Sequence, residues 1–415
     1  MPNKFAARTL YMLLVVLVVG LTVNTVYRSG PHKLGTRTFG SKTHRTDFTV
    51  YHEAGRAVLD GRNIYEVFNP RGWVYQYLPV FSILMVPLGC LSVFWASLIW
   101  CLVSQAMIAH TIWLSLRVTR QLWPQQRLPD LWLASTVVAL LFWPIVSGVE
   151  RGQASPLIAW LLTWSVSFLL RQQPWRAGAA LAAAIVLKIF PALLLPFFAW
   201  KRQWRPLVAT MLWLAVLVWG VPSLVFGVAG NQALLRQWWT TVARPANEPE
   251  GAGENPRFTQ MINPRIDRNQ SMQAVAIRWM GEGRERTARA VAAAINLSLL
   301  AVSAWAMSRG AQEPRRWLVQ LCVVVLLMLV LAPVSWLHNF VLMALPLAAA
   351  VALGFGCGAK PMRWAVIVFA AGMIAARAMP CCYRGGTLLA GTLAIWCAFV
   401  GWLARRGNEN TFSLV

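Results

Sequence analysis

Asp47 opens the stretch of the sequence that is best suited to acid–base chemistry, residues 47–57 (DFTVYHEAGRA). Thr46 can cap a helix there and Gly61 can end it. On such a helix Asp47 and Tyr51 share a face, because residues four apart lie one turn above each other. The segment is then either an amphipathic surface helix capped by Asp47 or the carrier of a carboxylate that acts as general base.

Lys188 lies between two apolar stretches, residues 180–187 and 189–198. A charge inside a membrane segment costs about 3 kcal/mol on insertion scales, so it needs an anionic partner or a wet cavity. The acids of the chain offer no obvious partner at that depth, whereas the phosphate of a ligand would supply one. The alternative is that the side chain snorkels to the outer interface.

Two further groups of polar residues follow residues 47–57 along the chain. Tyr65, Tyr75 and Tyr77 either contact a substrate or belong to an aromatic belt at the membrane interface. Arg151 and Gln153 stand at an outer helix entrance, with glycine between them. Gln153 either binds a sugar hydroxyl or caps the helix.

The C-terminal half contributes two short motifs. Asn269-Gln270-Ser271 matches an N-glycosylation sequon, and it also suits a polar binding turn before an amphipathic helix. Ser335-Trp336-Leu337-His338 joins two apolar runs. His338 is either a satisfied interface histidine or a residue that binds phosphate or handles a proton.

The composition determines what kind of scaffold must hold these residues. The 415 residues are 58% hydrophobic and 13% charged, against a globular norm near ~25% charged. This excludes a disordered chain and an ordinary soluble enzyme, and it indicates an all-α polytopic membrane protein. The net charge of +24 comes from basic clusters between apolar runs, which is typical of membrane borders and not of nucleic-acid binding.

Apolar runs and basic loops together predict the topology. Runs long enough to span lie at roughly 9–27, 94–116, 131–148, 154–170, 206–227, 287–308, 317–333, 338–357, 362–379 and 385–404. The basic clusters expected in the cytoplasm are Lys4/Arg8, Arg117/Arg120/Arg127, Arg171/Arg176, Lys201/Arg202/Arg205, Arg309/Arg315/Arg316, Lys360/Arg363 and Arg405/Arg406. Both termini are then cytoplasmic.

Two stretches fit this scheme only if they do not cross as single helices. Residues 76–90 are expected to form a re-entrant or interfacial hairpin. Residues 176–200 are expected to break near Lys188 and return as two short helices, which brings the count to twelve crossings or half-crossings. Non-helical backbone at that depth lines a cavity or is buried in protein. The long external segments are then 28–75 and 228–286, and they hold most of the 14 acidic residues.

In their order and spacing these motifs resemble glycosyltransferase family 87, a family of GT-C-fold membrane enzymes. It includes polyprenyl-phosphate-mannose-dependent α-mannosyltransferases of bacterial cell envelopes. The resemblance extends from residue 46 to about 346. Two positions depart from the family pattern: Ala154 follows Gly-Gln where Asn is common, and Ala332-Pro333 stands where Ser-Pro is frequent.

The resemblance implies one GT-C-like transmembrane domain over residues 1–415 in a bacterial plasma membrane. It implies a polyprenyl-phosphate-sugar donor, with mannose favoured, a glycolipid or glycan acceptor, and an active site on the external face. Asp47 would be the base of an inverting displacement, and Lys188 and His338 would lie near the donor phosphate or sugar. The residues expected to bind substrate are Tyr51, His52, Arg56, Tyr75, Tyr77, Arg151, Gln153, Lys188, Asn269, Gln270, Ser271, Ser335, Trp336 and His338.

No metal or other cofactor is expected, because cationic side chains can hold a monophosphate and the chain has no Asp-x-Asp sequence. Two alternatives remain at this point. A transporter or flippase of lipid-linked glycans also has a buried lysine and broken helices, but no acid lies deep in a span to form a coupling relay. An enzyme like the O-antigen ligases shares the large external loop, but we expect it to rely on external basic and histidine residues.

Overall fold

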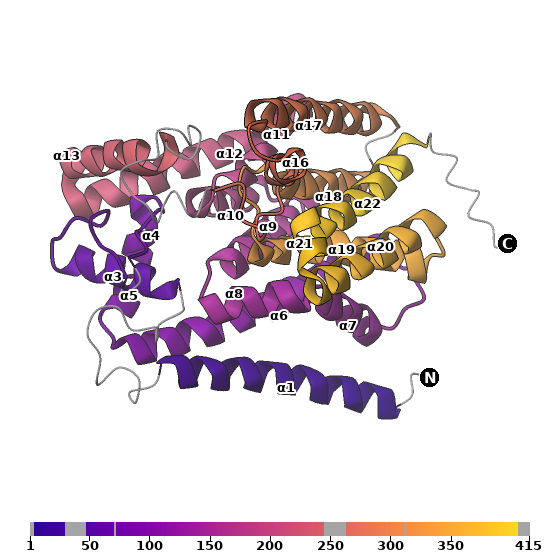
Figure 1. Ribbon diagram of the computed structural model, residues 1–415, viewed down its shortest axis with the longest axis horizontal. Helices are drawn as coiled ribbons and strands as arrows, with labels where there is room; N and C mark the ends of the chain where they lie inside the picture. The colour runs from indigo at the N-terminus through magenta and orange to yellow at the C-terminus, as the bar shows by residue number, and fades with distance from the viewer. Residues whose placement is uncertain (1–3, 30–46, 70–71, 245–262, 311–312, 406–415) are drawn as a thin grey trace. The chain divides into compact units, whose positions relative to one another are not determined.

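The computed structural model describes residues 4–29, 47–69, 72–244, 263–310 and 313–405, and these ranges are almost entirely helical. The predicted all-α architecture is therefore confirmed. The helices are α1 (Lys4–Ser29), α3 (Phe48–Leu59), α4 (Pro79–Leu84), α5 (Val86–Gly89), α6 (Val93–Leu122), α7 (Asp130–Leu140), α8 (Phe142–Arg151), α9 (Ser155–Leu170), α10 (Pro174–Leu187), η1 (Phe190–Leu193), α11 (Leu194–Trp200), α12 (Trp204–Ala215), η2 (Val216–Gly220), α13 (Val221–Trp238), η3 (Trp239–Ala243), α16 (Met272–Met280), α17 (Glu285–Ser308), α18 (Pro314–Leu331), η5 (Leu337–Met343), α19 (Ala344–Val351), η6 (Ala352–Gly356), α20 (Lys360–Ala378), α21 (Pro380–Gly385) and α22 (Thr387–Ala404) (Figure 1).

The lengths and hydropathies of these helices are those of a polytopic membrane protein. Within the described ranges, 7 helices are long and apolar enough to cross a bilayer, or up to 8 if the bent pair α7–α8 counts as one span. Shorter apolar helices add to them at 15–27, 155–170, 174–187 and 190–200. The multi-pass prediction is confirmed, while the count of twelve crossings and the cytoplasmic termini remain predictions.

The contacts divide the chain into two compact units. The first comprises residues 1–111, 142–263 and 337–342, and the second comprises 112–141, 264–336 and 343–415. Each unit gathers segments that are distant in the sequence. The short stretch 337–342 belongs to the first unit although its neighbours on both sides belong to the second.

In the first unit, the predicted break at Lys188 is present. α10 ends at Leu187, Lys188 is extended (φ −152°, ψ 137°), and the chain resumes as η1 and α11. Pro191 explains the change, because it has no backbone N–H for the Leu187 carbonyl and its ring would clash with that carbonyl in a continuous helix. Residues 76–90 likewise form two short helices, α4 and α5, in place of a span.

Close packing holds α3 against α4 and α5, which lie together in Figure 1. A Cβ added at Gly55 would meet the carbonyl oxygen of Met85 at 2.6 Å, and one added at Gly89 would meet the amide nitrogen of Arg56 at 2.8 Å. The two glycines therefore allow the helix backbones to touch. This contact fixes α3, the helix that follows Asp47.

The structure bears on three predicted helix boundaries. Asp47 itself is the residue before α3 and makes no side-chain cap bond, whereas the expected cap Thr46 lies outside the described residues. The run 131–148 is not one helix, since it breaks at Leu141 into α7 and α8. The run expected to end at 227 does end there, because Gly227 leaves the helical conformation (φ 71°, ψ 162°), and a further helical stretch then continues to Ala243.

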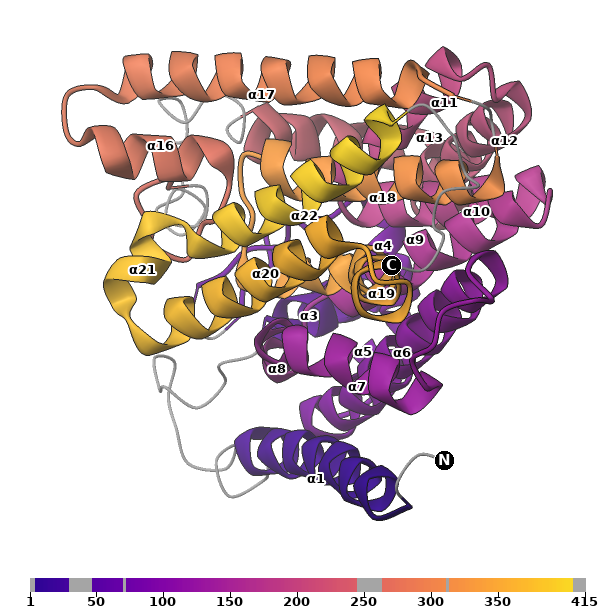
Figure 2. The same cartoon turned by 90° about the vertical axis from the view of Figure 1, so that its right-hand side faces the viewer.

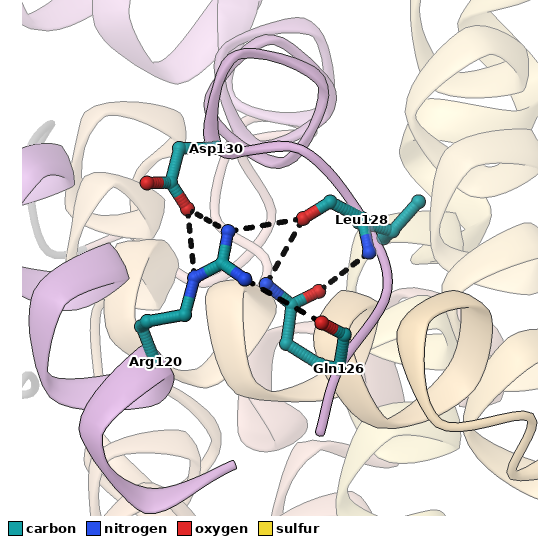
Figure 3. Close-up of polar contacts among 4 residues, drawn as sticks. All are labelled: Arg120, Gln126, Leu128 and Asp130. Carbon is teal, nitrogen blue, oxygen red and sulfur yellow. Dashed lines mark hydrogen bonds and ion pairs between the residues drawn. The ribbon is translucent and has the colours of Figure 1, made fainter. Parts of the chain in front are cut away.

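In the second unit, α18 is almost wholly buried and packs against α22, while α20 and α22 make the most extensive helix contact (Figure 2). The connection between α6 and α7 also belongs to this unit and is held by Arg120 (Figure 3). The Arg120 guanidinium pairs with Asp130 and donates to the carbonyl of Leu128 at 3.2 Å. Gln126 closes the same turn by accepting from the Leu128 amide at 2.8 Å.

Candidate functional site

The Asp47 carboxylate is held by the turn between α8 and α9. The Asp47 amide donates to the Arg151 carbonyl at 2.6 Å, and Gln153 Nε2 donates to Asp47 Oδ2. Both contacts come from a three-residue stretch, so the start of α3 is fastened to this turn by main chain and side chain together. The carboxylate is half-buried and therefore keeps access to a reacting group.

The Gln153 amide is oriented by what it contacts. A carboxylate only accepts hydrogen bonds, so the amide nitrogen faces Asp47 and the oxygen is left for Tyr51, whose hydroxyl lies 3.4 Å from it. Tyr51 also shares a 2.7 Å hydrogen bond with the Tyr77 hydroxyl. Burial, followed by the neighbouring Tyr77 and Asp47, raises the pKa of Tyr51 well above its usual value. Tyr51 thus stays protonated and supports Gln153 as a neutral hydroxyl.

Gly152 makes this turn possible. Its φ of +63° is in the left-handed region, and a Cβ there would lie 2.5 Å from the Cβ of Phe48. Its carbonyl accepts from the Trp100 indole at 2.9 Å. Neither the backbone conformation nor the space permits a side chain.

We expect Gly152→Ala to destabilise the protein by roughly 2–5 kcal/mol, the sum of left-handed strain and overpacking. Gly61→Ala is the matched control, because Gly61 also has a positive φ (+65°) but nothing lies within 4 Å of its would-be Cβ. That control should cost only the strain, about 1–2 kcal/mol. Thermal melting in detergent measures both, and equal losses in the two variants would show that the Phe48 contact is unimportant.

A second arrangement, also in the first unit, surrounds Lys188. Its ammonium donates to Asn339 Oδ1 at 2.7 Å, and Ser155 Oγ donates to the same oxygen at 3.0 Å. Asp47 is close enough to Lys188 to interact with it electrostatically. The base candidate and the ammonium thus belong to one cluster.

Arg151 and His338 complete the cluster. His338 is buried (6% exposed) and interacts electrostatically with both Lys188 and Arg151. Its Cβ also lies 3.9 Å from the position of a Cβ added to Gly148 in α8. A lysine, an arginine and an imidazole thus interact in one cluster, and the Asp47 carboxylate interacts with its lysine.

Loss of the Gln153 contact should reduce catalysis more than stability. In Gln153→Ala the carboxylate can rotate away from its productive position, and small displacements of a reacting group cost about 10²-fold in rate. We expect such a loss in kcat with an unchanged melting temperature. Gln105→Ala is the control, because the Gln105 amide donates to Thr22 and Cys101 in the same unit and lies outside this cluster. Full activity of Gln153→Ala would show that Asp47 needs no fixed orientation.

Three predicted substrate-binding residues of the first unit lie in other settings. His52 is fully buried, and its Nε2 is 2.9 Å from the Leu91 carbonyl, so it anchors α3 to the turn after α5. Tyr75 is buried and donates to the Leu78 carbonyl at 3.1 Å. Arg56 is exposed at the end of α3. Burial and backbone bonding give His52 and Tyr75 a structural role.

The predicted binding residues of the second unit form a clamp between two loops. Asn269 Oδ1 accepts from the amide of Ser335 at 2.9 Å, and the Ser271 hydroxyl donates to the Pro333 carbonyl at 3.0 Å. Gln270 donates from its side chain to the Tyr383 carbonyl at 2.8 Å. Asn269, Gln270, Ser271 and Ser335 are wholly buried, and Trp336 is half-buried. These contacts favour loop fixation over sugar binding, and the burial of Asn269 is incompatible with its glycosylation in the folded chain.

One site residue was missed from the sequence. Asn339 was not expected to contribute, although it directly follows His338 in a run of polar residues between apolar spans. Ser155, the hydrogen-bond partner of Asn339, likewise lies close in sequence to a predicted site residue, Gln153. Within the described ranges no group of three or more His, Cys, Asp or Glu side chains is placed to hold a metal ion.

Comparison with protein families decides the class. The model described as Glycosyltransferase family 87 matches residues 75–333, well over half of the chain. The chain belongs to glycosyltransferase family 87. The matched residues include Gln153 and Lys188 and begin after Asp47. Family membership and the apolar helices together confirm the prediction of an all-α membrane glycosyltransferase.

Two relatives of this chain carry the same description, polyprenol-phosphate-mannose-dependent alpha-(1-2)-phosphatidylinositol mannoside mannosyltransferase. The one from Mycolicibacterium smegmatis is 27% identical, over 82% of this chain and 76% of its own length. The one from Mycobacterium tuberculosis is 29% identical, over 74% of this chain and 70% of its own. Among solved structures, ArnT from Cupriavidus metallidurans bound to undecaprenyl phosphate matches with a TM-score of 0.38 and 14% identity, covering 95% of this chain and 77% of that one. At that TM-score the likeness carries no argument.

Proposed function

We propose that this family 87 member transfers mannose from a polyprenyl-phosphate-mannose donor to a glycolipid or glycan acceptor of the cell envelope. The donor and the lipid-borne acceptor are those named for the two mycobacterial relatives. The observation that carries the proposal for this chain is the cluster in which an oriented carboxylate, Asp47, approaches a cationic region around Lys188. Glycosyl transfer from a lipid monophosphate needs a base for the acceptor hydroxyl and positive charge near the departing phosphate.

In this mechanism Asp47 is the general base. An acceptor hydroxyl attacks the anomeric carbon of the donor, and its proton passes to the Asp47 carboxylate as the new glycosidic bond forms. Gln153 holds the carboxylate toward the acceptor. The transition state resembles an oxocarbenium ion, and a single displacement inverts the anomeric centre.

The cationic side of the cluster serves the leaving group. The bond between the anomeric carbon and the phosphate oxygen breaks with its electron pair on the phosphate, which gains negative charge. Lys188 and Arg151, which both interact electrostatically with His338, stabilise that charge in a half-buried site. No metal is needed in this scheme, because the side chains of Lys188 and Arg151 can hold the monophosphate.

The proposed site faces the external side of a bacterial plasma membrane, with both chain termini in the cytoplasm. The support is the distribution of charge. Basic clusters concentrate in the alternate short loops that should be cytoplasmic, and the segment containing Asp47 lies on the opposite side in this scheme.

The choice of donor tests the proposal. The purified protein in nanodiscs is supplied with a lipid extract from its own membranes as acceptor and with radiolabelled mannose on either polyprenyl phosphate or a nucleoside diphosphate. We expect labelled glycolipid or glycan from the polyprenyl-phosphate donor alone. Transfer from the nucleotide donor, or from a polyprenyl-phosphate donor carrying a different sugar in preference to mannose, would contradict it.

A further inference from the structure

Lys188 is held by a neutral partner. Its ammonium carries three donors and no acceptor, so the Asn339 atom 2.7 Å away must be the amide oxygen. The Ser155 hydroxyl must then be the donor in its 3.0 Å contact with the same oxygen. Asn339 is 2% exposed and Ser155 is fully buried, so the shared amide oxygen is enclosed by protein, whereas Lys188 itself is half-buried.

The neutrality of Asn339 has a chemical consequence. A carboxylate in its place would accept the same two hydrogen bonds and would form an ion pair with Lys188. That pair would cancel the positive charge on which an incoming phosphate depends. An amide oxygen fixes the ammonium in position and leaves its charge, and two of its three donors, for another anion.

The contact of Asn339 with Lys188 and Ser155 joins three segments. Lys188 lies at the break after α10, Ser155 begins α9, and Asn339 lies in η5, three segments of the first unit. α9 and α10 pack closely against each other. The side chain of Asn339 therefore links the Lys188 side chain, at the backbone break, to Ser155 at the start of α9.

We propose that Asn339 is a positioning residue that holds Lys188 through a neutral amide, without an ion pair at that contact, for the phosphate of the polyprenyl-phosphate sugar. This inference rests on the proposed function and names a residue that neither the sequence motifs nor the family match singled out. The proposed role needs a neutral amide. The informative substitution is therefore Asn339→Asp, which keeps the shape of the side chain and adds a negative charge.

The test compares Asn339→Asp with wild type by binding and by kinetics. Binding of polyprenyl phosphate and of uncharged polyprenol to the purified protein in nanodiscs is measured without any transfer reaction. We expect Asn339→Asp to keep its melting temperature and its polyprenol binding but to bind polyprenyl phosphate roughly 10- to 100-fold more weakly, with the KM for donor raised in proportion. Asn69→Asp, which buries a carboxylate at another buried asparagine of the same unit, should not change the preference for phosphate over alcohol.

A purely structural role gives the opposite result. Asn339→Asp preserves both hydrogen bonds, so a structural residue would leave polyprenyl-phosphate binding and donor KM unchanged, and that outcome overturns the proposal. If Asn339→Asp melts early, Asn339→Ala replaces it, and unaltered phosphate binding in that variant is equally decisive. Weakened phosphate binding in a protein that transfers no mannose would support the role of Asn339 and refute the proposed function.

Discussion

Replacement of Asp47 by Asn should abolish sugar transfer while the protein folds and binds donor normally. The amide retains an oxygen that can accept from Gln153 Nε2, so the turn between α8 and α9 stays fastened to α3. It cannot accept the proton of the acceptor hydroxyl. Loss of a general base costs typically ~10²–10⁴-fold in rate, so kcat should fall by that factor. Initial rates of mannose transfer in nanodiscs, at matched protein amounts, measure the effect.

The control for Asp47→Asn is Glu53→Gln on the same helix. Glu53 is a half-buried carboxylate that faces His52, with 3.7 Å between Oε1 and Nδ1, and it lies outside the cluster. Its variant should transfer mannose at nearly the wild-type rate. Equal rates for Asp47→Asn and wild type would remove Asp47 from the chemistry. A large fall in donor binding by Asp47→Asn would make it a binding residue instead.

Replacement of Lys188 by Met should reduce both donor binding and turnover. Methionine keeps a similar length and suits the apolar neighbours at the break, so the variant tests charge with little change in packing. Loss of one group that stabilises developing negative charge costs about 10²–10³-fold in kcat. Unlike Asp47→Asn, this variant should also raise the donor KM, because the donor phosphate is already charged in the ground state.

Lys201→Met is the matched control for Lys188→Met. Lys201 follows α11, and its ammonium lies 4.3 Å from the ring centroid of Trp200, a setting typical of the membrane interface. Its loss should leave the donor KM unchanged. If Lys188→Met retained wild-type donor KM and kcat, the ammonium would have a structural role and the phosphate would be held elsewhere.

Features that follow from local chemistry were predictable from the sequence. Apolar runs identified the helices that can span a membrane. Lys188 and Pro191 in one apolar stretch indicated the break after α10, because a buried charge and a proline each disfavour a continuous span. Helical spacing placed Asp47 and Tyr51 on one face, and both contact Gln153.

Features that depend on contacts between distant segments were not predictable. Nothing in the neighbourhood of Asn339 reveals that Lys188, 151 positions earlier, donates to it. For the same reason the Asn269–Ser271 motif suggested a binding turn, whereas its polar atoms clamp the loop at Pro333–Ser335. The sequence likewise suggested His52 as a substrate-binding residue, whereas in the structure its Nε2 lies beside the carbonyl oxygen of Leu91.

The anomeric configuration of the product tests the central claim most directly. Mannose is transferred by the wild-type protein from a polyprenyl-phosphate donor of defined configuration, and the new glycosidic linkage is determined by NMR. One-step displacement with Asp47 as base predicts inversion in every product molecule. Retention of the donor configuration would contradict the account, since a single displacement from the face opposite the leaving phosphate cannot retain it.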